Sequence, residues 1–237
     1  MRKRKKNRIV WLIVTLVLVV GIFLVLSDGS EENTHATELM ELPDGFQSYG
    51  IDVSHYQKEI NWSSVKESMD SLDFFVYCKV TEGLSLVDER WEENHHHLDE
   101  EKIKHGAYHF FRPGQSATWQ AKHFMNHYTY DPGHLPPVLD AEVEGISNEF
   151  LINGMKNWLE RIENQWHVRP IIYTSWSFYK NKFKGKFPGY KFWIARYGDE
   201  GEWLDDPNII HWQYSDNGRV AGIEEPVDLN ISKEHFN

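Results

Sequence analysis

Two acidic residues separated by one position stand at the end of a short apolar run. Residues 136–145 read Pro-Pro-Val-Leu-Asp-Ala-Glu-Val-Glu-Gly, and the pair is Asp140 and Glu142. A proline pair before the run and a glycine after it predict a short buried strand. Because side chains alternate along a strand, we expect both carboxyls on one face, with Cα atoms roughly 6.5 Å apart.

Two carboxyl groups at that spacing repel each other when both are ionised, so the pKa of at least one should be raised. A protonated acid beside an ionised carboxylate is the arrangement used in glycoside hydrolysis. A strand end with two solvated acids would have the same sequence, so the pair alone leaves both interpretations open.

The rest of the chain alternates predicted strands and helices. Helices are predicted at 61–68, 88–104, 116–128 and 147–166, the last from the helical spacing of its apolar residues. Strand-like runs lie at 49–54, 74–80, 107–111, 169–174, 191–196, 209–214 and 222–230, in addition to the run ending at Asp140. Little helical pattern separates the last three runs. This order predicts an α/β fold, a TIM-like barrel whose final units have lost their helices.

Further acidic residues coincide with these strand ends. Asp52 and Glu82 lie at or near the ends of the first two strands, and Asp228 lies in the last strand-like run. Active sites of such barrels lie at the C-terminal ends of the strands. We therefore expect these residues beside Asp140 and Glu142 in one acidic site.

Eight short motifs, in order along residues 49–231, resemble those of the family-25 glycoside hydrolases, the lysozymes typified by fungal Chalaropsis and phage endolysin muramidases. They are Gly50-Ile51-Asp52-Val53-Ser54, Lys79-Val80-Thr81-Glu82-Gly83, Tyr108-His109-Phe110, Asp140-Ala141-Glu142, Ile172-Tyr173-Thr174, Trp193-Ile194-Ala195, Trp212-Gln213-Tyr214 and Val227-Asp228-Leu229-Asn230. The resemblance implies a flattened (β/α)5(β)3 barrel over residues 49–237. It also implies hydrolysis of the β-1,4 bond between N-acetylmuramic acid and N-acetylglucosamine in peptidoglycan.

The same resemblance implies roles for the four carboxyls. Glu142 would be the general acid, and Asp140 would orient the substrate's 2-acetamido group or stabilise the positive charge at the anomeric carbon. Asp52 and Asp228 would tune Glu142 and bind substrate. Substrate-assisted enzymes escape the usual spacing rule for carboxyl pairs, and we expect retention through the acetamido group.

Five further residues are predicted to bind substrate. Tyr108, Tyr173 and Trp193 match motif positions near strand ends and could stack on sugar faces. Lys79 and Glu82 would form a buried ion pair or hydrogen-bond the sugar, and the sequence leaves both open.

Two groups of histidines suggest metal ligands at first sight. His95, His96 and His97 lie on a charged predicted helix, which favours a solvated face. His123 and His127 are four residues apart, but Phe124 follows His123 where a zinc-protease helix needs glutamate. We therefore expect no metal and no other cofactor.

The N-terminus predicts a membrane anchor. Residues 1–8 are strongly basic, and residues 9–26 form an uncharged run of 18 residues, long enough to span a bilayer. The basic end should stay in the cytoplasm, with residues 27–48 as a flexible linker and the barrel outside, periplasmic or at the cell surface. The alternative is a cleaved signal peptide and a secreted enzyme. The lack of an Ala-x-Ala-like cleavage site after the run argues against that alternative.

Charge restricts the partners. Residues 31–237 hold 19 basic and 35 acidic residues, a net charge of −16, which excludes nucleic acid as a natural partner. We expect a monomer that acts on peptidoglycan glycan strands. Two rival hypotheses remain open: a barrel that binds glycan without cutting it, and a metal-dependent polysaccharide hydrolase or deacetylase built on Asp and His.

Overall fold

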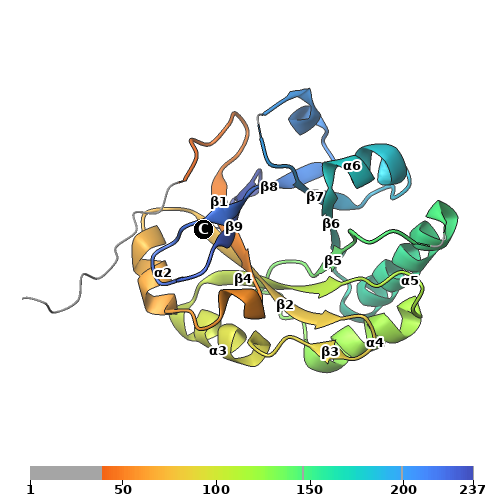
Figure 1. Ribbon diagram of the computed structural model, residues 1–237, viewed down its shortest axis with the longest axis horizontal. Helices are drawn as coiled ribbons and strands as arrows, with labels where there is room; N and C mark the ends of the chain where they lie inside the picture. Colours follow the sequence, from red (N-terminus) through yellow and green to blue (C-terminus); the bar gives the residue numbers. More distant parts are fainter. Residues whose placement is uncertain (1–38, 146, 199, 237) are drawn as a thin grey trace, which may run out of the picture. The chain divides into compact units, whose positions relative to one another are not determined.

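The structure is a computed structural model and describes residues 39–145, 147–198 and 200–236. Eight strands form a closed sheet in the order β1-β9-β8-β7-β6-β5-β4-β2, and β2 pairs with β1 to complete the barrel (Figure 1). The strands are β1 (Ser48–Val53), β2 (Phe74–Glu82), β4 (Lys104–Phe110), β5 (Val138–Asp140), β6 (Ile171–Ser175), β7 (Lys191–Ala195), β8 (Ile209–Gly218) and β9 (Val227–Ser232). A two-residue strand, β3 (Leu86–Val87), pairs antiparallel with the end of β2.

The predicted α/β barrel is confirmed. From β1 round to β8 the neighbouring strands of the barrel run parallel, whereas β9 is antiparallel to both β8 and β1. The eight residues between β8 and β9 are too few for a helical crossover, and parallel neighbours need a connection of about a dozen or more residues. The last strand therefore returns as a hairpin.

The helices cover the outside of the barrel (Figure 1). They are α2 (Trp62–Met69), α3 (Trp91–Glu101), α4 (Ala117–His127), α5 (Asn148–Trp166) and the short α6 (Trp176–Phe178), which continues into a π-helical turn, η2 (Tyr179–Phe183). Two 3₁₀ turns, η1 (His55–Gln57) and η3 (Glu202–Asp205), follow β1 and β7. The side chains of Asn61 and Ser147 cap α2 and α5 as their sequences indicate.

Two helical predictions need correction. The predicted helix 88–104 is shorter, because Lys102 adopts a left-handed conformation that ends α3 and Lys104 already begins β4. The sequence analysis also found no helix after residue 174, where the structure has α6 and η2. That segment is too short to show helical periodicity.

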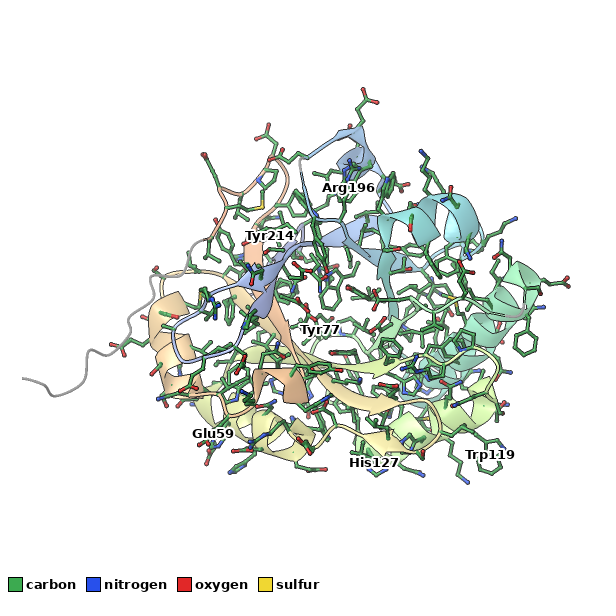
Figure 2. All side chains as sticks on the ribbon, in the orientation of Figure 1. Glu59, Tyr77, Trp119, His127, Arg196 and Tyr214 are labelled. Carbon is green, nitrogen blue, oxygen red and sulfur yellow. The ribbon has the colours of Figure 1, made fainter. Side chains whose placement is uncertain are left out.

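Aromatic side chains fill the interior of the barrel. Phe75, Tyr77 and Trp193 are almost completely buried there, and Tyr77 lies near the centre of the barrel (Figure 2). The rings leave no room for neighbouring side chains: a Cβ atom on Gly50 would lie 2.5 Å from the Phe75 ring, and one on Gly106 would lie 2.4 Å from the Tyr77 ring. Closely packed aromatic rings therefore fill the barrel interior beneath the C-terminal ends of the strands.

Part of the predicted linker belongs to the barrel. Phe46 is buried, Leu39 and Leu42 pack on the core, and the hydroxyl of Tyr49 donates to the carbonyl of Met40 at 3.0 Å. The prediction of a flexible linker is thus wrong for residues 39–48, because the few apolar side chains among polar neighbours are enough to hold this segment on the core. The basic tail 1–8, the apolar run 9–26 and residues 27–38 lie outside the described residues. Within the part of the chain that is described, no helix has the length and apolar character needed to cross a bilayer.

Candidate active site

A pocket of about 280 Å³ opens at the C-terminal ends of the barrel strands. All nine residues that the sequence analysis assigned to catalysis or substrate binding line it, namely Asp52, Lys79, Glu82, Tyr108, Asp140, Glu142, Tyr173, Trp193 and Asp228. They come from seven strands and the segment after β5. The barrel therefore brings together a set of residues spread over 177 positions of sequence.

Asp52 and Asp228 form one acidic pair in this pocket. They are directly opposite each other in the β1–β9 pair. Asp52 Oδ2 accepts hydrogen bonds from Gln213 Nε2 at 2.9 Å and Asn230 Nδ2 at 2.8 Å. Burial raises the pKa of Asp52 to about 6, although these donors and Asp228 oppose the shift.

Burial, followed by the charge of Asp52, raises the pKa of Asp228 to about 9. At neutral pH Asp228 is therefore protonated and hydrogen-bonded to an ionised Asp52. Gln213 and Asn230 lie in two of the motifs quoted above, but the sequence predicted no role for either. Asn230 could have been found from its position two residues after Asp228, which places it on the same face of β9.

Asp140 and Glu142 form the second pair, but not as neighbours on one strand. Strand β5 ends at Asp140, and the amide of Ala141 donates to the carbonyl of Tyr173 before the chain leaves the sheet. Asp140 is therefore fixed and buried, whereas Glu142 lies in the connection and is exposed to solvent. The prediction that Asp140 and Glu142 lie two positions apart on one strand is therefore wrong.

Both carboxyls of this pair have a raised pKa, as the sequence predicted for at least one. Burial, followed by the charge of Glu142, raises the pKa of Asp140 well above its usual range. The buried Oδ1 atom of Asp140 has no hydrogen-bond partner among the described residues, which makes ionisation more costly. Although Glu142 is open to solvent on one side, the protein atoms packed around it in the pocket desolvate its carboxyl and, with the charge of Asp52, raise its pKa, whereas the hydrogen bond with Asp140 opposes the shift. The pair therefore retains a proton where an isolated glutamate would be ionised.

Lys79 and Glu82 form an ion pair, one of the two alternatives left by the sequence, in which Lys79 is buried and Glu82 is half-buried. Lys79 Nζ lies 2.7 Å from Glu82 Oε2, and the opposite carboxylate oxygen accepts from Arg112 Nε at 2.9 Å. Burial opposes ionisation of Glu82, but the two cations hold its pKa below the usual value. Arg112, which the sequence analysis missed, also lies over the Phe110 ring, 4.6 Å from its centroid.

The predicted aromatic residues lie in the floor of the pocket. Trp193 is 1% exposed, and its Nε1 donates to Asn230 Oδ1 at 2.8 Å. The Tyr173 hydroxyl donates to Gln213 Oε1 at 2.9 Å, so both aromatic residues support the groups that bind Asp52. Tyr56, 72% exposed at the rim, offers a far larger face than Trp193 for stacking on a sugar.

The histidines lie outside this pocket. His123 Nε2 donates to the carbonyl of Leu86, and the His123 ring packs edge-on against His127, consistent with surface packing. His96 and His97 have side chains 68% and 45% exposed, as predicted. The prediction is wrong for His95, which packs flat against Trp91 and contacts His105.

Comparison with known proteins gives one family match and several similar sequences. Residues 51–223 match the model of Glycosyl hydrolases family 25. Lysozyme M1 of Streptomyces globisporus is 35% identical over 201 residues, covering 76% of this chain and 66% of that protein. The protein YegX of Escherichia coli strain K12 is 36% identical over 196 residues, 81% of this chain and 72% of YegX.

The fold agrees with solved structures. The crystal structure of the bacterial lysozyme from Streptomyces coelicolor superimposes with a TM-score of 0.70 at 32% identity, covering 80% of this chain and 93% of that one. The match to the family model spans most of the described barrel, from β1 to the connection before β9. The chain therefore belongs to family 25 of the glycosyl hydrolases.

Proposed function

We propose that the protein is a lysozyme, an N-acetylmuramidase that hydrolyses the β-1,4 bond between N-acetylmuramic acid and N-acetylglucosamine in peptidoglycan. The observation that carries the proposal is the pocket itself, where two carboxyl pairs with raised pKa values meet at the strand ends of a family-25 barrel. Lysozyme M1 and the lysozyme of Streptomyces coelicolor support this choice of substrate.

Glu142 is the general acid in this proposal. It is the exposed member of a pair that retains a proton, so it is the carboxyl that a glycosidic oxygen can reach. Asp140, buried beneath it, keeps that proton within the pair until substrate binds. Proton transfer from Glu142 to the glycosidic oxygen then allows the bond to the anomeric carbon to break.

The substrate's own acetamido group acts as the nucleophile. Its carbonyl oxygen attacks the anomeric carbon as the leaving group departs, and Asp140 orients the group through its N–H. Water then attacks the same carbon from the opposite face, the bond between that carbon and the acetamido oxygen breaks, and a proton of the water returns to Glu142, with net retention of configuration. Asp52, held ionised by Gln213 and Asn230, stabilises the positive charge that develops, while protonated Asp228 prevents a second negative charge beside it.

The rim residues supply binding. The Lys79–Glu82–Arg112 ion-pair cluster forms one polar wall of the pocket, and Tyr56 forms an apolar face at the rim. Tyr108 also lines the pocket, and the buried Tyr173 and Trp193 form part of its floor. A non-catalytic glycan-binding barrel would not need the two proton-sharing carboxyl pairs, because their mutual burial costs folding free energy.

The N-terminal segment completes the proposal. Residues 1–8 stay in the cytoplasm, residues 9–26 cross the membrane, and the barrel acts outside as a monomer. Since residues 39–48 pack on the barrel, the tether is residues 27–38. Twelve residues reach at most about 40 Å in any conformation, which restricts the enzyme to glycan near the membrane and suits wall remodelling.

The test is mass spectrometry of muropeptides after digestion of purified peptidoglycan by the full-length enzyme, followed by borohydride reduction. Muramidase action gives reduced muramic acid ends. Reduced glucosamine ends would assign the other glycosidic bond, and no new reducing ends would favour a binding barrel. Unchanged product formation after brief treatment with EDTA would exclude the metal-dependent hydrolase or deacetylase.

A further inference from the structure

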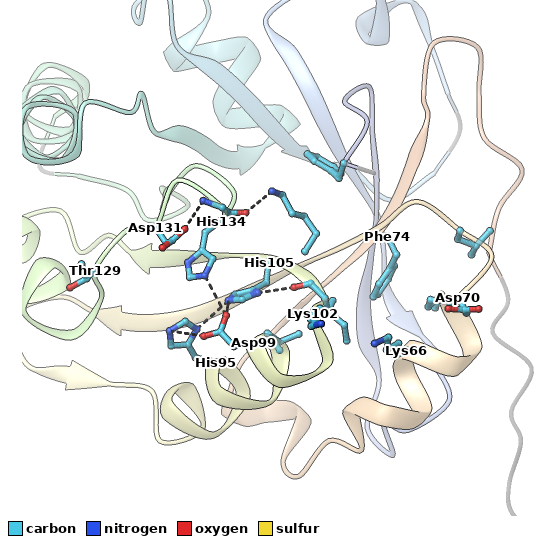
Figure 3. Close-up of a pocket in the computed structure, with 17 residues that line it drawn as sticks. Lys66, Asp70, Phe74, His95, Asp99, Lys102, His105, Thr129, Asp131 and His134 are labelled. Atoms are coloured by element: carbon cyan, nitrogen blue, oxygen red, sulfur yellow. Dashed lines mark hydrogen bonds and ion pairs between the residues drawn. The ribbon is translucent and has the colours of Figure 1, made fainter.

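A cluster of histidines and one carboxylate lies at the end of the barrel opposite the active site. His105 is the second residue of β4, whereas Tyr108 and Phe110 of the same strand line the catalytic pocket. His95 and Asp99 reach His105 from successive turns of α3, and His134 approaches from the connection before β5 (Figure 3). The cluster lies in the wall of a second pocket of about 760 Å³.

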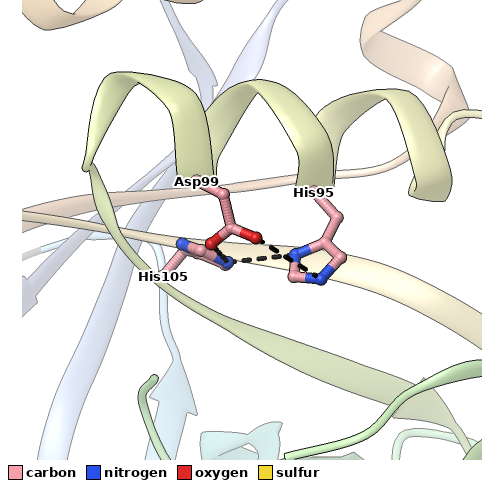
Figure 4. A group of neighbouring side chains, drawn as sticks. All are labelled: His95, Asp99 and His105. Atoms are coloured by element: carbon pink, nitrogen blue, oxygen red, sulfur yellow. Dashed lines mark hydrogen bonds and ion pairs between the residues drawn. The ribbon is translucent and has the colours of Figure 1, made fainter. Parts of the chain in front are cut away.

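The potential ligand atoms lie close together. His95 Nδ1 is 3.1 Å from His105 Nε2, and Asp99 Oδ1 is 3.6 Å from His105 Nε2 and 3.4 Å from His134 Nε2. One donor atom from each of His95, Asp99 and His105 lies within 4.8 Å of the others (Figure 4). Ligands bound tetrahedrally to zinc at 2.0–2.1 Å are about 3.3 Å apart, so these separations suit a single ion.

The surrounding groups orient the rings for metal binding. His105 Nδ1 lies 2.8 Å from the carbonyl oxygen of Ile103, which can only accept, so Nδ1 carries the proton and the Nε2 lone pair faces the cluster. The His95 ring stacks on Trp91 with centroids 4.6 Å apart, and the Tyr128 hydroxyl lies 3.3 Å from His134 Nδ1. Such outer contacts are typical of histidines that ligate metals.

The local charge does not oppose a cation. Three lysines and three aspartates line the pocket, Lys66, Lys102, Lys104, Asp70, Asp99 and Asp131. Lys104 donates to the carbonyl of Gly133 and Lys66 to that of Glu101, so both ammonium groups are directed at other partners. The open pocket gives an ion a path from solvent to the cluster.

From this geometry we propose that His95, Asp99, His105 and His134 bind one Zn²⁺ ion in a structural site. The ion would join α3, the start of β4 and the connection before β5, three segments at the end of the barrel remote from Glu142. With four protein ligands the site has no open position for substrate, so its effect is on stability rather than on hydrolysis.

The test uses the full-length chain, purified in detergent without a polyhistidine tag and freed of metal by chelation. Titration with Co²⁺ should give the intense visible bands of tetrahedral coordination at one ion per chain, and Zn²⁺ should displace it. A Zn²⁺ concentration 100-fold above the Kd should raise the Tm by roughly 5–10 °C. The rate of glycan hydrolysis at 25 °C should be the same with and without the ion.

Helix α3 offers a matched control. His96 and Glu100 are also four residues apart, with His96 Nε2 at 3.4 Å from Glu100 Oε1, but they lie on the exposed face of the helix. Asp99→Asn and His105→Gln should each weaken Zn²⁺ binding by about 100-fold or more, since even loss of outer-shell contacts costs about 10–100-fold. The double variant His96→Gln/Glu100→Gln should bind as the parent does. Asp99 is exposed, so Asp99→Asn tests the site even if His105→Gln fails to fold.

The proposal is overturned if the metal-free parent binds no stoichiometric Zn²⁺ at micromolar concentration, because the cluster is then a hydrogen-bond network alone. It is equally overturned if the His96/Glu100 variant loses as much affinity as Asp99→Asn, which would mean unspecific binding by surface histidines.

Discussion

Asp52 and Asp228 lie directly opposite each other across the antiparallel β1–β9 pair, an arrangement in which two ionised carboxylates would repel. The pair is compatible with the fold because Asp228, with a pKa raised to about 9, is neutral and donates to Asp52, whose own pKa is about 6. The reversal of the last strand thus places a protonated acid beside an ionised one at the mouth of the barrel.

Asp228→Asn should stabilise the protein at neutral and alkaline pH. Because the folded-state pKa of Asp228 is raised, folding takes up a proton between about pH 4 and pH 9, and this contribution to stability is lost as the pH rises through that window. Asparagine is neutral at every pH and can still donate to Asp52. The Tm of the variant should exceed that of the parent by an amount that grows from pH 5 to pH 8. Each kcal/mol of stability gained should raise the Tm by about 2–4 °C.

The control is Glu67→Gln, an exposed acid on α2 outside the catalytic pocket. Its Tm should follow that of the parent at each pH. A Tm difference for Asp228→Asn that stays constant or shrinks between pH 5 and pH 8 would show that Asp228 is ionised in the folded protein.

Gln213→Met should move the acidic limb of the kcat/KM profile. The parent limb should lie near pH 6, where Asp52 ionises. Methionine cannot donate to the Asp52 carboxylate, so the pKa of Asp52 should rise and the limb should move to higher pH by about 0.5–1 unit. The control is Tyr197→Phe, which removes the hydrogen bond to Gln213 Oε1 but leaves Gln213 Nε2 to donate to Asp52. This variant should have its acidic limb at the parent's pH. An acidic limb at the same pH in the parent, Gln213→Met and Tyr197→Phe would show that ionisation of Asp52 does not set this limb.

Much of this architecture could be predicted from residue patterns. The apolar spacing of α5 located that helix within one residue, and the structure shows Ser147 as its cap. The positions of Asp52 and Asp140 at strand ends predicted a common site before any geometry was known, because all C-terminal ends of parallel barrel strands meet at one face. Asp228 reaches the same face from the start of β9 because that strand is antiparallel.

Other features depend on contacts between distant segments. The strand that contains Asp140 ends two residues before Glu142, because backbone hydrogen bonding to β6 stops at Ala141. Gln213 and Asn230 belong to the site only because β8 and β9 bring them to Asp52. His105 and His134 are unremarkable in the sequence. Only the four-residue spacing of His95 and Asp99 on a predicted helix could have pointed to a ligand pair.

Asp140→Asn should reduce hydrolysis of N-acetylated peptidoglycan by about 100-fold or more, the usual scale for loss of a catalytic carboxyl. If Asp140 acts on the acetamido group, de-N-acetylated glycan should already be a poor substrate for the parent. The mutation should then cost little more, because both changes remove the same interaction. Rates on the two glycans, measured by reducing-end release, give the comparison. Efficient cleavage of the de-N-acetylated glycan by the parent would instead indicate direct carboxylate attack or an activated water.

The N-terminal proposal predicts an integral membrane protein with an intact N-terminus. After cell fractionation the enzyme should stay in the membrane pellet through carbonate washing, and Edman sequencing should begin at or next to Met1. Replacing Val17 by arginine should interrupt the apolar run near its middle and reduce the membrane fraction. A soluble form that begins after about residue 26 would establish a cleaved signal peptide and remove the limit on reach.

The most direct measurement is the rate of peptidoglycan hydrolysis by Glu142→Gln beside the parent enzyme, with glycan affinity and Tm determined on the same samples. Glutamine has nearly the same shape but cannot act as an acid, so kcat should fall by at least about 10²–10⁴-fold while affinity and Tm stay close to parent values. Hydrolysis by Glu142→Gln within threefold of the parent rate would contradict the assignment of Glu142 as the general acid.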